Sequence, residues 1–182
     1  MFHLNTEQLI DYWRARRGVE PVAHRSAIDP SHVLNLVPQL FILGRRRAGD
    51  YQFRLTGDFL TELHARELRG TDFLALWRTD DRVSLQMALE AVRRRGEPLV
   101  VTCDARTQTN AILRMEIALA PLANAEGDRS RFLGLYQPIS PVAALDDRAV
   151  LGLAVRAIAT PDSGEAGFPK LRLATLHGAP AR

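Results

Sequence analysis

The chain has 182 residues, of which 46% are hydrophobic and 25% charged, values that fit one folded domain and exclude a chain disordered as a whole. Its net charge of +3 comes from 24 basic and 21 acidic residues, but the arginine clusters fall at expected helix ends and at a hairpin tip, so we expect no nucleic-acid partner. The single cysteine excludes an internal disulfide, and no apolar run approaches the roughly 20 residues of a membrane span or forms a secretion signal. We therefore expect a soluble, cytoplasmic protein without membrane contact.

The N-terminal part is expected to contain two helices. Asn5 followed by Gln8 resembles a capping box, which predicts a helix that begins at Asn5 and ends at Gly18. Asp29-Pro30 is typical of a second helix start, and that short helix would end near Pro38. One face of the first helix carries Leu9, Tyr12 and Trp13.

Two strands are expected between Gln39 and Thr56, joined by a turn at Ala48-Gly49-Asp50. In the second strand Tyr51, Phe53 and Leu55 alternate with polar residues, which predicts that all three are buried on one face.

Helices and then strands follow. Short helices are expected over Gly57–Arg66 and after Gly70, and a long helix is expected from about Asp80 to Arg95. Three alternating runs then predict strands at residues 99–106, 113–119 and 131–139. This order predicts an α+β fold with a five-stranded antiparallel sheet, short helices on one face and an N-terminal flanking helix.

The segment Tyr51–Trp77 resembles the signature of a PAS-domain family that is common in alphaproteobacteria. The motif has the form R-L-x-G, a short helix, then R-E-L-x-G-x-x-F-x-x-L-W, and Asp29-Pro30, Pro38 and Pro138 also fit the family. The chain departs from it at His64-Ala65, where members carry an aromatic residue and glycine. Its matching positions are Arg54, Leu55, Gly57, Arg66, Glu67, Leu68, Gly70, Phe73, Leu76 and Trp77. The resemblance implies a PAS-like sensory or regulatory protein and names no catalytic residue.

A sheet covered by short helices favours an apolar pocket between the two layers. The alternative is that the same side chains simply form the packed core. The candidate ligand-binding residues are Phe53, Leu55, Phe59, Leu63, His64, Phe73, Trp77, Leu89, Val92, Val101, Cys103, Leu113, Met115 and Leu135.

Two of these residues carry chemistry. His64 is expected to be a solvent-facing helix residue, with a haem or metal ligand as the alternative. Cys103 lies on the apolar phase of its strand and is expected to be a buried, unreactive thiol. We expect neither haem nor flavin and no metal site, and we leave any other cofactor open.

No catalytic residues are expected, because the paired carboxylates Asp80-Asp81 and Asp146-Asp147 fall at expected helix starts and no hydrolase or nucleotide-binding motif is present.

Arg54 and Glu116 could form a cross-strand pair if their strands are neighbours. Leu9, Tyr12 and Trp13 are the candidate dimer interface, since the first helix would cover the outer face of the sheet.

We divide the chain into an N-terminal flanking helix and connector (residues 1–28), a PAS-like domain (29–140) and a C-terminal extension (141–182). In the extension, residues 150–158 permit a helix or a strand, residues 160–167 predict a loop and residues 171–176 a short strand. The function expected is a non-enzymatic sensory or regulatory module that binds a small apolar ligand, signals through protein–protein contacts, or does both. We expect it to be a homodimer with a signalling protein as partner. The alternatives are a ligand-free protein–protein adaptor or dimerisation domain and, third, a small-molecule enzyme of the same shape.

Overall fold

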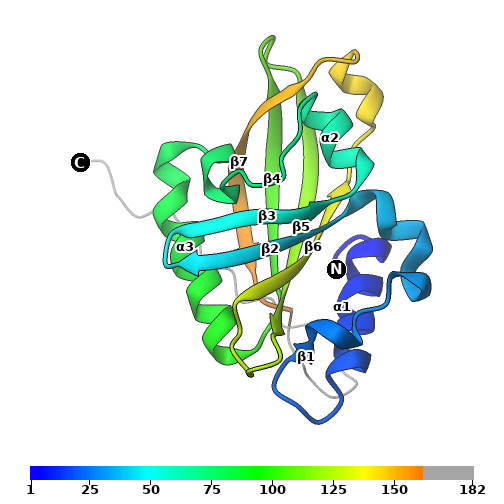
Figure 1. Ribbon diagram of the computed structural model, residues 1–182. Coiled ribbons are helices and arrows are strands. Elements are labelled where there is room, and N and C mark those ends of the chain that lie inside the picture. Colours follow the sequence, from blue (N-terminus) through cyan, green and yellow to red (C-terminus); the bar gives the residue numbers. More distant parts are fainter. Residues whose placement is uncertain (162–182) are drawn as a thin grey trace.

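The computed structural model describes residues 1–161 (Figure 1). A single curved sheet runs through the molecule, with helices on both of its faces. The helices are α1 (Leu4–Arg17), η1 (Arg25–Ala27), η2 (Pro30–Gln39), α2 (Asp58–His64), η3 (Phe73–Leu76), α3 (Thr79–Arg95) and η4 (Val142–Leu145), where η marks a 3-10 helix. The strands are β1 (Ala23–His24), β2 (Leu40–Arg47), β3 (Asp50–Thr56), β4 (Leu99–Thr107), β5 (Ile112–Ala123), β6 (Arg131–Pro138) and β7 (Val150–Ala159).

The strand order is β3-β2-β6-β5-β4-β7, and neighbours along this path are antiparallel. The predicted α+β fold and its five central strands are confirmed. The structure adds β7, which pairs with β4 and shows that residues 150–158 form a strand, and the two-residue β1, which pairs in parallel with β5. The predicted strand at 171–176, and the predicted loop beyond residue 161, lie outside the described residues.

The sheet separates two hydrophobic clusters. On the inner face α2, η3 and α3 cover the sheet, and Phe73 of η3 and Leu89 of α3 share one cluster with strand side chains such as Phe41. On the outer face α1 and η2 bury Leu9, Trp13 and Leu36 against Ala118 and Leu135. Figure 1 shows α1 and α3 on opposite sides of the sheet. Because both faces are covered, β5 is buried almost throughout its length.

Helix α1 begins one residue before the predicted start. Its N-cap is His3, whose Nδ1 accepts a hydrogen bond from the backbone N–H of Asn5 at 3.1 Å, so the predicted cap at Asn5 is wrong. The side chain of Asn5 instead donates to Oε1 of Gln137 at 2.9 Å. The Asn5 side chain thus bonds to Gln137 on β6 instead of capping the helix, as its local spacing predicted. Gly18 ends the helix at a positive φ, as predicted.

A β-bulge in β3 changes the face to which Leu55 points. Phe53 is opposite Leu43 and Leu55 is opposite Ile42, so Arg54 is the extra residue between two paired positions. Ile42 belongs to the outer cluster, and Leu55 beside it is 50% exposed. The prediction that Leu55 is buried with Tyr51 and Phe53 is therefore wrong.

Two further expectations are corrected by the structure. Arg54 and Glu116 cannot pair across neighbouring strands, because β2 and β6 separate β3 from β5. Leu9 and Trp13 are fully buried against this chain's own sheet, where Nε1 of Trp13 donates to the Pro121 carbonyl at 2.8 Å, so neither is free to contact a second subunit. Tyr12 packs at the edge of the same cluster and its hydroxyl donates to the carbonyl of Asp29 at 2.9 Å.

The two pairs of acidic residues have different positions. Asp80 and Asp81 lie in the first turn of α3, as predicted, where Oδ2 of Asp81 also accepts from the N–H of Val155 at 2.9 Å. Asp146 and Asp147 follow η4 with positive φ and precede β7, so the prediction that they start a helix is wrong.

Candidate ligand site beneath the helices

The inner face of the sheet brings most of the predicted lining residues together. Phe59 packs against the edge of this cluster, whereas Leu55 and Leu135 lie on the outer face and line nothing beneath α2 and α3. The predicted lining residues that are buried in the inner cluster are Phe53, Leu63, Phe73, Trp77, Leu89, Val92, Val101, Cys103, Leu113 and Met115.

An aromatic group occupies the centre of this layer, and the sequence-based list omitted two of its members. Phe41 of β2 lies 5.4 Å from Tyr136 of β6, centroid to centroid, in an edge-to-face arrangement. Phe73 of η3 lies 6.1 Å from Phe41 and 5.6 Å from Trp77. Phe41 and Tyr136 were missed because both belong to continuous apolar strands, in which alternation does not say which face a side chain joins.

His64 enters this group from the last turn of α2. It is 4% exposed, so the expectation of a solvent-facing residue is wrong, and its ring lies 5.9 Å from that of Tyr136. Nδ1 lies 3.0 Å from the carbonyl oxygen of Val150 on β7. Because a carbonyl only accepts, Nδ1 carries the proton and Nε2 of the neutral ring is an acceptor.

Burial keeps His64 neutral. It lowers the pKa of the imidazole from 6.5 to about 4, with Arg66 acting in the same direction and the Val150 carbonyl opposing it. At neutral pH the ring is therefore an uncharged acceptor within an aromatic layer.

Three buried polar atoms of this layer have no hydrogen-bond partner among the described residues: Nε2 of His64, the hydroxyl of Tyr136 and Nε1 of Trp77. Tyr136 is fully buried and Trp77 is 1% exposed. Buried polar groups in proteins are nearly always paired, and an unpaired one costs about 1–3 kcal/mol. The inner layer thus combines apolar side chains with one free acceptor and two free donors.

The cysteine of this layer is inert. Cys103 is fully buried, and burial followed by the charge of Asp104 raises the pKa of its thiol far above the ordinary value. The thiol stays protonated at neutral pH, which agrees with the expected small hydrophobic role.

The inner layer reaches the surface beside α2. A half-open hollow of about 220 Å³ lies between α2 and η4, and its lining includes Phe59, Val142 and Asp147. Leu63 and Leu145 line the hollow and also belong to the inner cluster, and Leu63 is the chain neighbour of His64. The hollow therefore borders the inner cluster directly, through Leu63 and Leu145.

A buried polar network joins α3 to the β2–β3 hairpin. Glu90 of α3 accepts hydrogen bonds from the Tyr51 hydroxyl and from Nε of Arg45, both at 2.5 Å, and its other oxygen contacts Arg93 at 3.1 Å. Burial alone would raise the pKa of Glu90, but the bonds from Arg45, Tyr51 and Arg93 outweigh it and lower the pKa from 4.5 to about 2. No local pattern predicts this network, because Arg45 belongs to a run of three arginines at the hairpin.

Among residues 1–161 no cluster of three or more His, Cys, Asp or Glu side chains has a metal-binding arrangement. In the same residues, no helix combines the length and the apolar character needed to cross a membrane.

The profile of the PAS domain family matches residues 1–137. Similar solved structures include a tryptophan-to-alanine variant of the Drosophila melanogaster Cycle PAS-B domain with bound glycerol, at 14% identity over 54% of this chain and 99% of that one, with a TM-score of 0.43. Another is the Rhodobacter sphaeroides LOV protein, at 12% identity over 65% of this chain and 72% of that one, with a TM-score of 0.47. A search of curated proteins finds no match.

Proposed function

Since the chain belongs to the PAS domain family, a family of sensory and signalling modules, we propose that it is a non-enzymatic sensor that binds a small, mainly apolar molecule beneath α2. The observation that carries the proposal is the set of unpartnered polar atoms on His64, Tyr136 and Trp77 inside an apolar layer. Small-molecule sites are typically apolar with a few placed polar groups, which is the chemistry found here.

The polar atoms restrict the ligand. Nε2 of His64 requires a donor, and the hydroxyl of Tyr136 requires an acceptor. The two rings meet edge to face with their centroids 5.9 Å apart, so one hydroxyl group beside both rings could accept from Tyr136 and donate to His64. We therefore infer an alcohol or a phenol with an apolar body.

Entry requires movement of short elements. The hollow between α2 and η4 is bordered by helices of seven and four residues. Short segments with few buried contacts open at the lowest free-energy cost. Displacement of Leu63 and Leu145 would join the hollow to the space beside His64 and would change the surface that a partner contacts.

The proposed output is a protein–protein contact made by a homodimer. Support comes from α3, whose outer face exposes Val83 and Met87 one helical turn apart, at 66% and 67%. A Met87→Glu variant should lower the dimer fraction in native mass spectrometry. The control is Met1→Gln, made in a chain with an added start methionine, because Met1 is also exposed. A dimer fraction unchanged by Met87→Glu would refute this surface.

The test of the ligand is native mass spectrometry of the purified protein against its denatured mass, together with thermal unfolding in added phenol or cyclohexanol. We expect extra non-covalent mass, or a raised Tm with one of the two probes, and loss of that effect in Tyr136→Phe. Tyr12→Phe is the matched control, because the Tyr12 hydroxyl bonds to Asp29 on the outer side.

The ligand-free adaptor is the second candidate, and the close contacts among Phe41, Phe53 and Phe73 favour it because they fill the layer. In that case the purified protein carries no extra mass and neither probe raises Tm. Tyr136→Phe would then stabilise the protein by about 1 kcal/mol, because it removes a buried hydroxyl that nothing satisfies. This set of results would overturn the sensor proposal.

A further inference from the structure

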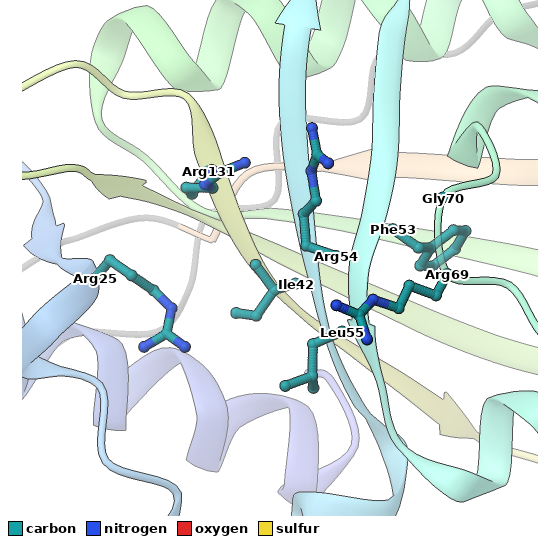
Figure 2. A pocket seen from close by; sticks show the side chains of 8 residues that line it. All are labelled: Arg25, Ile42, Phe53, Arg54, Leu55, Arg69, Gly70 and Arg131. Carbon is teal, nitrogen blue, oxygen red and sulfur yellow. The ribbon is translucent and has the colours of Figure 1, made fainter.

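A second hollow shares no lining residue with the one beside α2, and four arginines line it. It has a volume of about 480 Å³ and lies over the outer face of β2 and β3, next to the loop at Arg69-Gly70 (Figure 2). We call it the arginine groove. Its lining residues are Arg25, Ile42, Phe53, Arg54, Leu55, Arg69, Gly70 and Arg131, and no acidic residue is among them.

The four arginines come from four separate segments. Arg25 belongs to η1, Arg54 to β3, Arg69 to the loop before η3, and Arg131 to the start of β6. Figure 2 shows Arg25 and Arg69 on either side of Ile42 and Leu55. The fold thus gathers charges that are far apart in the sequence.

The positive charge of the groove is not neutralised by the described residues. None of its four guanidinium groups has an acidic partner within 4.0 Å among residues 1–161, whereas arginines elsewhere do. Arg45 and Arg93 pair with Glu90, and Arg156 pairs with Asp104. Like charges gathered in a concave site raise the local positive potential and attract anions.

Two backbone features shape the groove. Arg54 is the extra residue of the β3 bulge, and bulges commonly re-aim a side chain beside a functional site. At Gly44 of β2, an added Cβ would lie 2.7 Å from Nε of Arg54 and closer still to Nη1 of Arg131. The missing side chain at Gly44 therefore allows two guanidinium groups to lie over the same stretch of backbone.

We propose that the arginine groove binds a small organic diphosphate. Arginine forks match the oxygens of phosphate groups, and two phosphates supply the several negative charges that four arginines can neutralise. Ile42 and the half-exposed Leu55 form an apolar strip between Arg25 and Arg69, on which the organic part of the ligand would lie. The volume is within the range of small-ligand sites. This site is separate from the space beneath α2, so it does not depend on the proposed sensor function.

The test is isothermal titration calorimetry of the full chain with ADP, pyrophosphate, citrate and a short oligothymidylate. We expect ADP to bind more tightly than pyrophosphate because of the apolar strip, and citrate to bind most weakly. Arg54→Gln and Arg131→Gln should each weaken ADP binding about tenfold or more, since each removes charge-assisted hydrogen bonds. Gly44→Ala should also weaken it by displacing both guanidinium groups.

Arg95→Gln is the matched control, because Arg95 is exposed at the end of α3 on the other side of the sheet and the variant loses the same charge. ADP binding should be unchanged in this variant. Circular dichroism of each variant shows that the fold is kept.

Three results would overturn the proposal. The first is no binding of ADP or pyrophosphate, and the second is equal weakening in Arg54→Gln and Arg95→Gln, which would mean unspecific attraction. The third is oligothymidylate binding more tightly than ADP with the same dependence on Arg54, which would make the groove a nucleic-acid surface.

Discussion

Replacement of Glu90 by glutamine should destabilise the protein strongly and in a pH-dependent way. The Glu90 side chain is 12% exposed, and its carboxylate is held by Arg45, Tyr51 and Arg93. These bonds keep the pKa at about 2, against an ordinary 4.5. A pKa held about 2.5 below its ordinary value corresponds to about 3 kcal/mol in favour of the charged form. Glu90→Gln should therefore lower the free energy of unfolding by about 3 kcal/mol at neutral pH.

The sign of the pH dependence follows from the lowered pKa. The stabilisation is complete above about pH 4.5, where the unfolded chain is also ionised, and it is lost as the pH falls towards 2. The difference in free energy of unfolding between the wild-type protein and Glu90→Gln should decrease from about 3 kcal/mol at neutral pH to roughly 1 kcal/mol near pH 3. Urea unfolding followed by tryptophan fluorescence measures both values.

Glu20→Gln is the matched control, because Glu20 is exposed in the connector after α1. Its effect should stay within about 0.5 kcal/mol at every pH. The reasoning would be refuted if the wild-type protein and Glu90→Gln differed by less than about 1 kcal/mol in free energy of unfolding at neutral pH, or if that difference grew on acidification. Either result would mean that the network does not stabilise the contact between α3 and the hairpin in the way described.

Two further variants test the inner layer. Because burial lowers the pKa of His64 to about 4, the free energy of unfolding of the wild-type protein should fall by up to about 3 kcal/mol between pH 6.5 and 4. His64→Asn should remove this pH dependence, whereas His24→Asn, at an exposed position, should keep it. The same pH dependence in the wild-type protein and His64→Asn would contradict a neutral buried ring. Gly134→Ala places a Cβ against the ring of Phe41 and should lower the free energy of unfolding in urea by about 1–3 kcal/mol. Gly127→Ala is the control, because its Cβ would meet open space and the only destabilisation comes from the positive φ of that residue. An unchanged stability of Gly134→Ala would show that the Phe41 ring can move.

Elements with strong local signals were predictable. The turn at Gly49, the Asp29 cap and the α3 helix ending at Gly96 all lie where the sequence placed them, because glycine at positive φ and capping side chains act within a few residues. The order of the elements followed from these signals. The α+β fold was therefore accessible from the sequence alone.

Errors arose where distant segments decide the outcome. The bulge at Arg54 depends on the register with β2 and reverses the phase of Leu55. His64 was expected to face solvent, yet it is buried beside Tyr136, and β7 brings the Val150 carbonyl to its ring. The arginine groove combines segments from residue 25 to residue 131, so no local spacing could reveal it.

The contacts of α1 set an order of events during synthesis of the chain. The backbone N–H of His3 donates to Glu116, Asn5 donates to Gln137, and Trp13 donates to Pro121. Each pair is separated by more than 100 residues, so α1 leaves the ribosome long before the surface that receives it exists. Until β5 and β6 have formed, the apolar face around Leu9 and Trp13 stays uncovered and open to chaperones or to aggregation. Docking of the first helix is thus a late step in folding, and contacts of such long sequence separation slow the rate at which the native state is reached.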